Sequence, residues 1–354
     1  MIPDVEFLRR LPKVQLHCHL EGTLRASTFL NLARRHGVAL TYGASENALP
    51  VKALEATDPD RVYDFTDFQA FLMTFAAVSR SLAEPEDYGL LAAEYVADAV
   101  DQNVVRAELF ISPSVWQFFN PDIDVRACLS AIRQSCDAYK SQIEVAFIVD
   151  LTRNFGAERA MRAAQLAVDL QDLGVIGIGL GGDESRYPPD LFADAFEFAR
   201  SKGLHCVAHA GEGAGPESVQ AAIEVLGAER IGHGVRALED EKTVQLLASR
   251  GVPLEVCPTS NFLTGVAKRD RAHPLLALDA AGCIVTIDSD DPALFRTSIT
   301  DEYAYVVKLA GPDTLLRFVR NAVDASFAPS ARKTELRLAL EAANLEPNAA
   351  RRTS

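Results

Sequence analysis

Eight short apolar runs, several rich in β-branched residues, recur along this 354-residue chain with helical patterns between them. A strand that alternates with a helix is typical of parallel βαβ units, and eight such units predict an α/β fold of the (β/α)8 TIM-barrel type. A doubly wound open sheet is the alternative, but no glycine-rich phosphate loop opens the first helix. The expected strands lie near residues 13–20, 105–112, 144–151, 174–181, 205–210, 230–235, 253–258 and 283–288, and helical patterns include 157–173 and 217–226.

No linker, repeat or low-complexity stretch divides the chain, which predicts one barrel domain over residues 1–345 and a short tail over 346–354. The connection between the first two strands is far longer than a usual βα loop, so we expect a long helical insertion after strand one. This insertion carries phenylalanines at near-helical spacing, which either bury a helix face in the core or form part of a lid over the site, and both can hold. They are Phe65, Phe68, Phe71 and Phe75.

Charge and composition narrow the range of partners. The formal net charge is −14, and no dense Lys/Arg cluster precedes the closing Arg351–Arg352, so phosphate-rich polymers would be repelled and nucleic acid is not expected as a partner. The first residues lack the features of a signal peptide, no apolar run is long enough to span a membrane, and the six cysteines form no Cys-x-x-Cys pair. We expect a soluble cytoplasmic protein that binds a small molecule, and no signal indicates its oligomeric state.

His17 and His19 occupy alternate positions in the first apolar run. Side chains alternate between the two faces of a strand, so both imidazoles point the same way and can bind one metal ion. Imidazole and carboxylate ligands suit zinc. A single histidine in an apolar strand is more often a packed core residue, so the pair gains weight only from the rest of the sequence.

Polar residues gather at the carboxyl ends of the later strands, where barrels of this type place their active site. Four of the seven histidines fall at these ends. Of the other three, His36 follows two arginines and is expected to be solvated, His205 starts its strand and is expected to be structural, and His273 carries no signal. The strand ends are His17–Gly22, Leu180–Glu184, His209–Glu212, Gly232–Gly234, Cys257–Asn261 and Asp288–Pro292.

Four of these motifs, taken in order, resemble the adenosine deaminase family within the amidohydrolase superfamily of metal-dependent barrels. Each motif alone is weak, but their combination and order are specific, and the resemblance covers the chain from Leu11 to Pro292. The motifs are the His17/His19 pair, His209-Ala210-Gly211-Glu212, Gly232-His233-Gly234 and Ser289-Asp290-Asp291-Pro292.

The resemblance implies one zinc ion held by His17, His19, His209 and Asp290. Three neutral imidazoles and one carboxylate leave the ion a net positive charge, which would lower the pKa of a bound water from about 15.7 toward about 7. Many related barrels hold two metals through a carbamylated lysine at the end of strand four. Residues 181–184 contain no lysine, so we expect a single metal.

The resemblance also implies how the catalytic side chains act. Glu212 would protonate a ring nitrogen of an aminopurine, and His233 would deprotonate and aim the attacking water, assisted by Asp290. The substrate would be held by the residues corresponding to His19, Glu21, Gly182 and Asp291, with Gly182 acting through its backbone N–H.

Each of these residues also has a structural interpretation. Glu212 can be a carboxylate favoured by a helix N-terminus, and His233 between two glycines can be a turn residue. Asp290 and Asp291 can cap the following helix. Asp183 and Glu184 have the least certain role and either support the site from behind or face solvent.

The predicted reaction is the zinc-dependent hydrolytic removal of the 6-amino group of an adenine nucleoside. The nucleoside is either adenosine or deoxyadenosine, or one with a modified 5′ end such as 6-aminodeoxyfutalosine. Family members that act on adenosine typically have Asp at the position of Glu21 and commonly Asp at that of Gly179. Adenine deaminases of the family favour Glu at the position of Glu21. They usually have Asp at the position of Gly232 and Ser-Ser-Glu at the positions of residues 182–184, where this chain differs.

Two other functions remain as alternatives. The first is deamination of free adenine, and the more remote one is an inactive barrel that only binds a purine or a metal. The cytidine-type zinc deaminases are excluded because their Pro-Cys-x-x-Cys signature is absent from the sequence.

Overall fold

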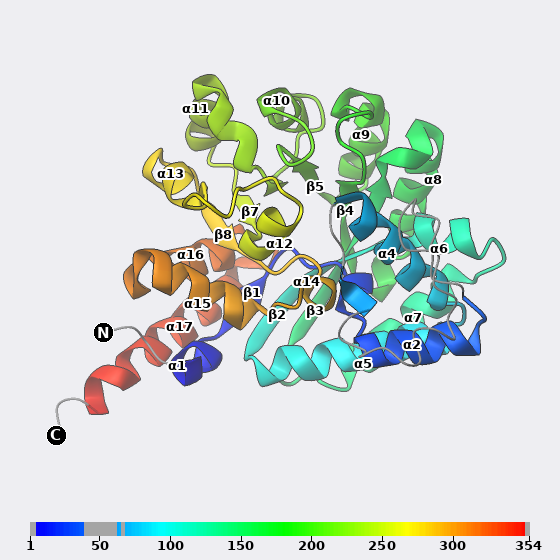
Figure 1. Ribbon diagram of the computed structural model, residues 1–354, viewed down its shortest axis with the longest axis horizontal. Helices are drawn as coiled ribbons and strands as arrows, with labels where there is room; N and C mark the ends of the chain where they lie inside the picture. The colour runs from blue at the N-terminus through cyan, green and yellow to red at the C-terminus, as the bar shows by residue number, and fades with distance from the viewer. Residues whose placement is uncertain (1–4, 39–61, 65–67, 351–354) are drawn as a thin grey trace.

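The computed structural model describes residues 5–38, 62–64 and 68–350, and within them eight parallel strands form one sheet in chain order. The end of the last strand meets the segment after the first, because His19 N–H donates to the Asp290 carbonyl at 3.0 Å and Asp290 N–H donates to the His17 carbonyl at 3.1 Å. The predicted TIM barrel is therefore confirmed (Figure 1). The strands are β1 Lys13–Gln15, β2 Val104–Ile111, β3 Glu144–Thr152, β4 Val175–Gly181, β5 His205–Ala210, β6 Arg230–His233, β7 Leu254–Val256 and β8 Val285–Ile287.

The first strand is shorter than the apolar run 13–20 suggested. The backbone N–H groups of Leu16 and His17 donate to Asp288 Oδ1, at 2.6 and 3.1 Å, instead of to a neighbouring strand. A side chain thus replaces part of the regular ladder, so His17 and His19 lie on irregular backbone beyond β1. An alternating sequence pattern does not reveal such a substitution.

Helices cover the outside of the barrel (Figure 1). The pattern expected over 157–173 is α8 followed by a 3-10 turn at Gln171–Leu173, and that over 217–226 is α10. No helix in the described part of the chain combines the length and apolar character needed to cross a membrane. The helices are α1 Val5–Arg10, α2 Ala26–Arg35, α4 Phe68–Ser81, α5 Pro85–Asp101, α6 Pro113–Phe119, α7 Val125–Asp137, α8 Gly156–Asp169, α9 Ala193–Ser201, α10 Pro216–Glu224, α11 Glu241–Arg250, α12 Pro258–Leu263, α13 Leu275–Ala280, α14 Pro292–Phe295, α15 Ile299–Ala310, α16 Pro312–Ala325 and α17 Ser330–Ala350.

The insertion between β1 and β2 contains α2, α4 and α5. Phe71 on α4 is buried and stacks on Phe295 with ring centroids 4.9 Å apart, while Phe75 packs 6.4 Å from the ring of His19. Phe65 and the side chain of Phe68 lie outside the described residues. The phenylalanines that are described therefore serve both the core and the active-site end of the barrel.

Two histidines outside the site have partners elsewhere. His205 pairs with Glu229 at 2.8 Å and stacks on Phe327 with centroids 3.8 Å apart, as expected of a structural residue. His36 was expected to be solvated, which is wrong: its side chain is 12% exposed and its Nε2 lies 2.9 Å from Asp87 Oδ2. The tail expected from residue 346 begins inside α17, which continues to Ala350.

A cluster of charged side chains fills the barrel interior below the site, and we call it the floor cluster: Arg106, Glu108, Arg230 and Glu255. Arg230 donates to Glu108 Oε2 at 2.6 Å and to Glu255 Oε1 at 2.5 Å, and Arg106 contacts Glu108 Oε1 at 2.8 Å. All four side chains are at most 2% exposed. Burying these charges is tolerable because opposite charges are paired within hydrogen-bond distance.

Candidate active site

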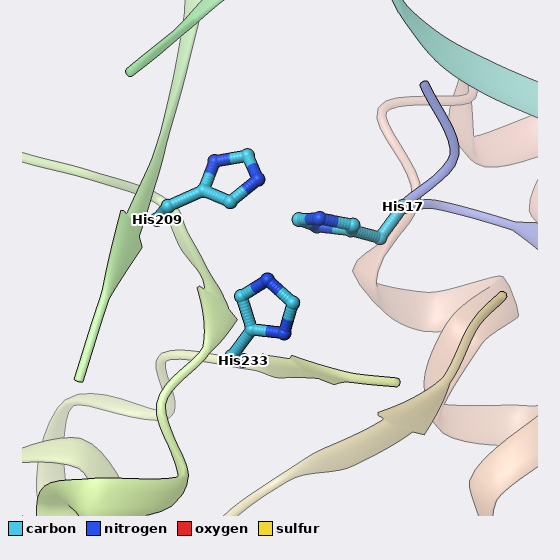
Figure 2. Close-up of side chains that lie close together, drawn as sticks. All are labelled: His17, His209 and His233. Atoms are coloured by element: carbon cyan, nitrogen blue, oxygen red, sulfur yellow. The ribbon is translucent and has the colours of Figure 1, made fainter. Parts of the chain in front are cut away.

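The imidazoles expected to form the site converge at the carboxyl ends of the strands. Figure 2 shows His17, His209 and His233 pointing toward one another, with ring centroids 4.5 Å (His17–His209), 4.9 Å (His17–His233) and 5.4 Å (His209–His233) apart. His17 follows β1, whereas His209 and His233 lie on β5 and β6. Residues far apart in the sequence thus meet because each follows or ends a strand of one closed barrel.

Three pairs of the predicted ligand atoms lie at distances that suit a shared zinc ion. The Nε2 atoms of His19 and His209 are 3.1 Å apart, and Asp290 Oδ1 lies 3.7 Å from His17 Nε2 and 3.5 Å from His19 Nε2. Two nitrogen ligands of a tetrahedral zinc ion are separated by about 3.3 Å. His17 Nε2 is buried and has no hydrogen-bond partner, as expected for an atom that binds a metal.

Neighbouring groups orient these ligands. His209 Nδ1 lies 3.1 Å from the Leu180 carbonyl, which can only accept a hydrogen bond, so the proton of neutral His209 is on Nδ1 and Nε2 is free to bind a metal. His17 Nδ1 lies 2.8 Å from a carboxylate oxygen of Glu255 in the floor cluster. The hydroxyl of Ser260 donates to Asp290 Oδ2 at 2.6 Å, leaving Oδ1 for the metal.

Geometry alone also permits a ligand set that includes His233, since ligand atoms of His17, His209 and His233 lie within 4.8 Å of one another. His233 differs from the other two in its surroundings. Its Nδ1 is engaged by Asn261 at 3.1 Å, and its Nε2 lies 3.6 Å from Glu212 Oε2 and 3.9 Å from Asp290 Oδ2. His233 therefore lies between the acidic residues as well as beside the metal ligands.

A hydrogen-bond relay behind His233 sets the position of its proton. The backbone N–H of Leu275 donates to His273 Nδ1 at 3.1 Å, so neutral His273 carries its proton on Nε2 and donates to Asn261 Oδ1 at 3.2 Å. The amide nitrogen of Asn261 must then be the group that donates to His233 Nδ1. Neutral His233 consequently carries its proton on Nε2, directed into the site. Burial lowers the pKa of His273 to about 4, which keeps it neutral.

Glu212 is held in place by the buried carboxylate of Glu184. That carboxylate accepts four backbone hydrogen bonds at 2.6–3.1 Å, from residues 211 to 214. Glu184 therefore supports the site from behind, whereas Asp183 binds Ser185 and Arg186 within its own turn. Burial raises the pKa of Glu212 to about 7 against the opposing effect of nearby His233, so its carboxyl can carry a proton near neutrality.

Two of the site residues have strained backbones. His233 and Asp290 have φ angles of 61° and 62°, in the left-handed region that residues with a Cβ rarely adopt. His233 ends β6 and Asp290 follows β8, and a sharp change of direction at each position turns the side chain into the site. Gly232 is also constrained, since a Cβ there would lie 2.7 Å from His17 Cε1.

Glu21 is not placed as a substrate contact. Its side chain is fully buried, and its Oε1 accepts hydrogen bonds from Ser112 N–H at 2.9 Å and Trp116 Nε1–H at 2.6 Å. Among the described residues that line the cavity over the site, Glu21 does not appear. Its carboxyl thus fixes the start of α6, and burial raises its pKa.

The cavity itself has a volume of about 290 Å³ and lies over the metal-site residues. Its lining includes the predicted residues His19, Gly182, His209, Glu212, His233, Asp290 and Asp291. Asp291 is buried with Oδ1 unpartnered, and burial beside Asp290 raises its pKa. One side is an aromatic wall formed by Phe71, Phe75, Phe118, Phe119 and Phe155.

Sequence reasoning missed two functional candidates here. Asn261 was part of a noted motif but received no role, and only the positions of His233 and His273 reveal one. Asp150 on β3 lines the cavity, yet it lies in a run that reads as an ordinary buried strand.

Comparison with known proteins identifies the family. The sequence model described as Adenosine deaminase matches residues 12–343. The chain belongs to the adenosine deaminase family. It is therefore a hydrolytic deaminase, an enzyme that removes an amino group with water, and metal dependence is a property of the superfamily.

Two relatives of this deaminase differ in their substrates. This chain is 36% identical to an adenine deaminase of Rhodospirillum rubrum, over 97% of this chain and 100% of that protein. It is also 36% identical to an aminodeoxyfutalosine deaminase of Streptomyces avermitilis, over 93% of this chain and 90% of that protein.

Solved structures show the same fold. An adenine deaminase from Arthrobacter aurescens has a TM-score of 0.83 at 29% identity, covering 94% of this chain and 98% of that one. A Burkholderia ambifaria amidohydrolase with bound zinc has a TM-score of 0.82 at 26% identity, covering 98% and 94%. The N6-methyl-AMP deaminase of Arabidopsis thaliana has a TM-score of 0.82 at 27% identity, covering 97% and 100%.

Proposed function

We propose that this chain is a zinc-dependent enzyme that removes the 6-amino group of an adenine nucleoside and releases ammonia. The observation that carries the proposal is the position of Glu212, a carboxyl that is 16% exposed and has a pKa raised to about 7, beside His233 and Asp290 in the cavity. Protonation of a ring nitrogen makes the adjacent amino-bearing carbon electrophilic, and a carboxyl of this pKa can donate that proton at neutral pH.

The metal ligands in this proposal are His17, His19, His209 and Asp290, with one ion per chain. Three of the distances between their ligand atoms suit a shared ion, and the zinc reported in the Burkholderia structure supports the choice of metal. A bound zinc ion supplies Lewis acidity that lowers the pKa of water to near 7.

The relay behind His233 changes the role that we assign to it. Because its Nε2 carries a proton in the neutral form, His233 donates a hydrogen bond into the site and orients the attacking water. The carboxylate of Asp290 then accepts the proton of that water, and this proton later leaves with ammonia. Gly182 and Asp291, which line the cavity, would hold the purine ring.

The nucleoside is proposed over the free base because the cavity continues beyond the catalytic side chains along the aromatic wall. Apolar side chains favour a 5′ substituent that is itself apolar or aromatic, as in 6-aminodeoxyfutalosine. The aminodeoxyfutalosine deaminase relative supports this choice, whereas the adenine deaminase relative supports the free base as the second candidate.

An ammonia-release assay tests the proposal across adenosine, deoxyadenosine, 6-aminodeoxyfutalosine, adenine and N6-methyladenine. We expect nucleosides to exceed adenine by orders of magnitude in kcat/KM, because polar groups built to bind a sugar are left unpaired by the free base. If adenine is deaminated and the nucleosides are not, the proposed substrate is wrong. If no compound releases ammonia, the proposed reaction is wrong.

A further inference from the structure

Asp150 is a buried carboxyl of the cavity wall to which the proposed chemistry gives no role. It lies near the carboxyl end of β3 and is 6% exposed. Its Oδ1 is buried without a hydrogen-bond partner. Such an oxygen is costly unless something that binds in the cavity completes its hydrogen bonds.

Two glycines of the neighbouring strand β4 make room for this carboxyl. A Cβ at Gly179 would lie 2.9 Å from Asp150 Oδ1, and a Cβ at Gly181 would overlap Oδ2. β4 therefore has no side chain at the two positions over which Asp150 extends. Relatives that act on adenosine commonly have an aspartate at the position of Gly179. In this chain the carboxyl of Asp150 reaches the space beside Gly179 from β3.

Among the described residues no cation forms an ion pair with Asp150, and Arg153 acts on it only from nearby. The nearby guanidinium of Arg153 donates to the carbonyls of Tyr187 and His209, at 2.6 and 2.7 Å. The described lining of the cavity contains no lysine or arginine. Burial, with the adjacent carboxyl of Glu21, raises the pKa of Asp150 to about 8. When it is protonated, the carboxyl of Asp150 can both donate a hydrogen bond to a neutral polar partner and accept one from it.

The barrel order indicates which part of the substrate faces Asp150. The catalytic residues follow or end β5, β6 and β8, whereas Asp150 is on β3, which lies opposite β7 in a sheet ordered β1 to β8. A purine whose amino-bearing carbon faces these three catalytic residues together directs its opposite edge, with N3 and N9, toward the strands across the barrel, among which is β3. In a nucleoside the sugar is attached at N9.

We propose that Asp150 is a specificity-determining residue that hydrogen-bonds a sugar hydroxyl of the nucleoside, and that the enzyme thereby selects nucleosides over adenine and over nucleoside 5′-phosphates. The inference rests on the proposed function. The described lining offers no cation to compensate a buried 5′-phosphate, whereas a neutral hydroxyl needs only the hydrogen bond that Asp150 provides. The enzyme should therefore discriminate against AMP, in contrast to the N6-methyl-AMP deaminase that shares its fold.

The test compares Asp150→Ala and Asp150→Asn with wild type on adenosine, adenine and AMP. Asp190→Asn, on the exposed 3-10 turn Pro189–Phe192, is the matched control. We expect Asp150→Ala to lower kcat/KM for adenosine by about 10²-fold and to change that for adenine by less than about 3-fold. Thermal unfolding verifies that each variant is folded, and Asp150→Leu replaces the Ala variant if the latter is not. The isosteric Asn variant keeps a donor and an acceptor, so its loss on adenosine should be smaller than that of the Ala variant.

Deoxynucleosides identify the hydroxyl. Among 2′-, 3′- and 5′-deoxyadenosine, one should have a kcat/KM with wild type as low as the kcat/KM of adenosine with Asp150→Ala. The Asp150→Ala variant should use that deoxynucleoside and adenosine equally well. Equal losses on adenine and adenosine, or no loss on either, would overturn the role of Asp150. Failure of wild type to release ammonia from any aminopurine would instead overturn the proposed function.

Discussion

The floor cluster and the carboxyls at the mouth of the barrel are two sets of buried charges with opposite properties. In the floor cluster, every carboxylate oxygen of Glu108 and Glu255 has a partner, including the Phe327 N–H at 2.7 Å and His17 Nδ1 at 2.8 Å. At the mouth, one oxygen each of Asp150 and Asp291 has none. Buried groups that are satisfied within the protein stabilise the fold, whereas groups left unsatisfied at a cavity indicate where a ligand binds.

The largest effect should come from removing a metal ligand. Asp290→Ala is expected to lose metal and activity together, because three imidazoles bind zinc far more weakly than three imidazoles with a carboxylate. Metal analysis of the purified protein should give about one zinc per chain for wild type and well under that for the variant. Two tightly bound ions per wild-type chain would contradict the single-metal site.

Breaking the floor cluster should instead destabilise the fold. Arg230→Met leaves Glu108 and Glu255 without their shared cation, and loss of one partner of a buried ion pair costs about 3–5 kcal/mol. Urea unfolding of the metal-free protein measures this change in the free energy of unfolding. Asp291→Asn at the mouth is the comparison, and we expect it to cost nothing or to stabilise. If both variants destabilise equally, the distinction between the two regions fails.

Glu212→Gln should keep the fold and the metal yet lower kcat by about 10²–10⁴-fold, because an amide cannot donate the proton. In wild type, kcat/KM should fall as pH rises above about 7, since Glu212 must be protonated and its pKa is raised to about 7. Asp183→Asn, which changes a carboxyl that faces its own turn, is the control. A variant with near-wild-type kcat would remove Glu212 from the mechanism.

The relay behind His233 predicts a smaller loss. Asn261→Ala removes the donor to His233 Nδ1, so the proton is no longer confined to Nε2, and we expect kcat to fall about 10-fold with KM little changed. Nitrogen chemical shifts of the His233 ring distinguish the two tautomers directly. Unchanged shifts in Asn261→Ala would show that the relay does not set the tautomer.

The last prediction concerns the pH dependence of stability. Asp150 has a folded pKa near 8, above that of an unfolded aspartate, so the folded state binds the extra proton. Its contribution is complete below about pH 4 and is lost as pH rises through about 8. The metal-free Asp150→Asn protein should lose less stability over this range than wild type, as measured by urea unfolding at several pH values. Parallel curves would refute the raised pKa.

The barrel and the convergence of its histidines were predictable from the sequence because strand ends meet on one face of such a fold. His17, His209, Glu212 and Asp290 each follow or end an apolar run, and the pattern alone places them together. The direction of Glu21 was not predictable, since it depends on Ser112 and Trp116, which come from a different part of the chain.

Asp150 and the relay were harder to find for related reasons. Asp150 is one polar residue within a buried strand, and its significance arises only beside the glycines of β4. The role of His273 depends on the N–H of Leu275 and on Asn261, which lies 12 residues earlier in the chain but is adjacent in space.

The four hydrogen bonds that Glu184 accepts from residues 211–214 have a consequence for the time course of each turnover. Those amide hydrogens should exchange with solvent slowly even in the ligand-free enzyme, although they belong to a loop. The acid is then already in place when a substrate arrives. Any slow step of binding or release should therefore arise in another segment around the cavity, and not in the loop that carries Glu212.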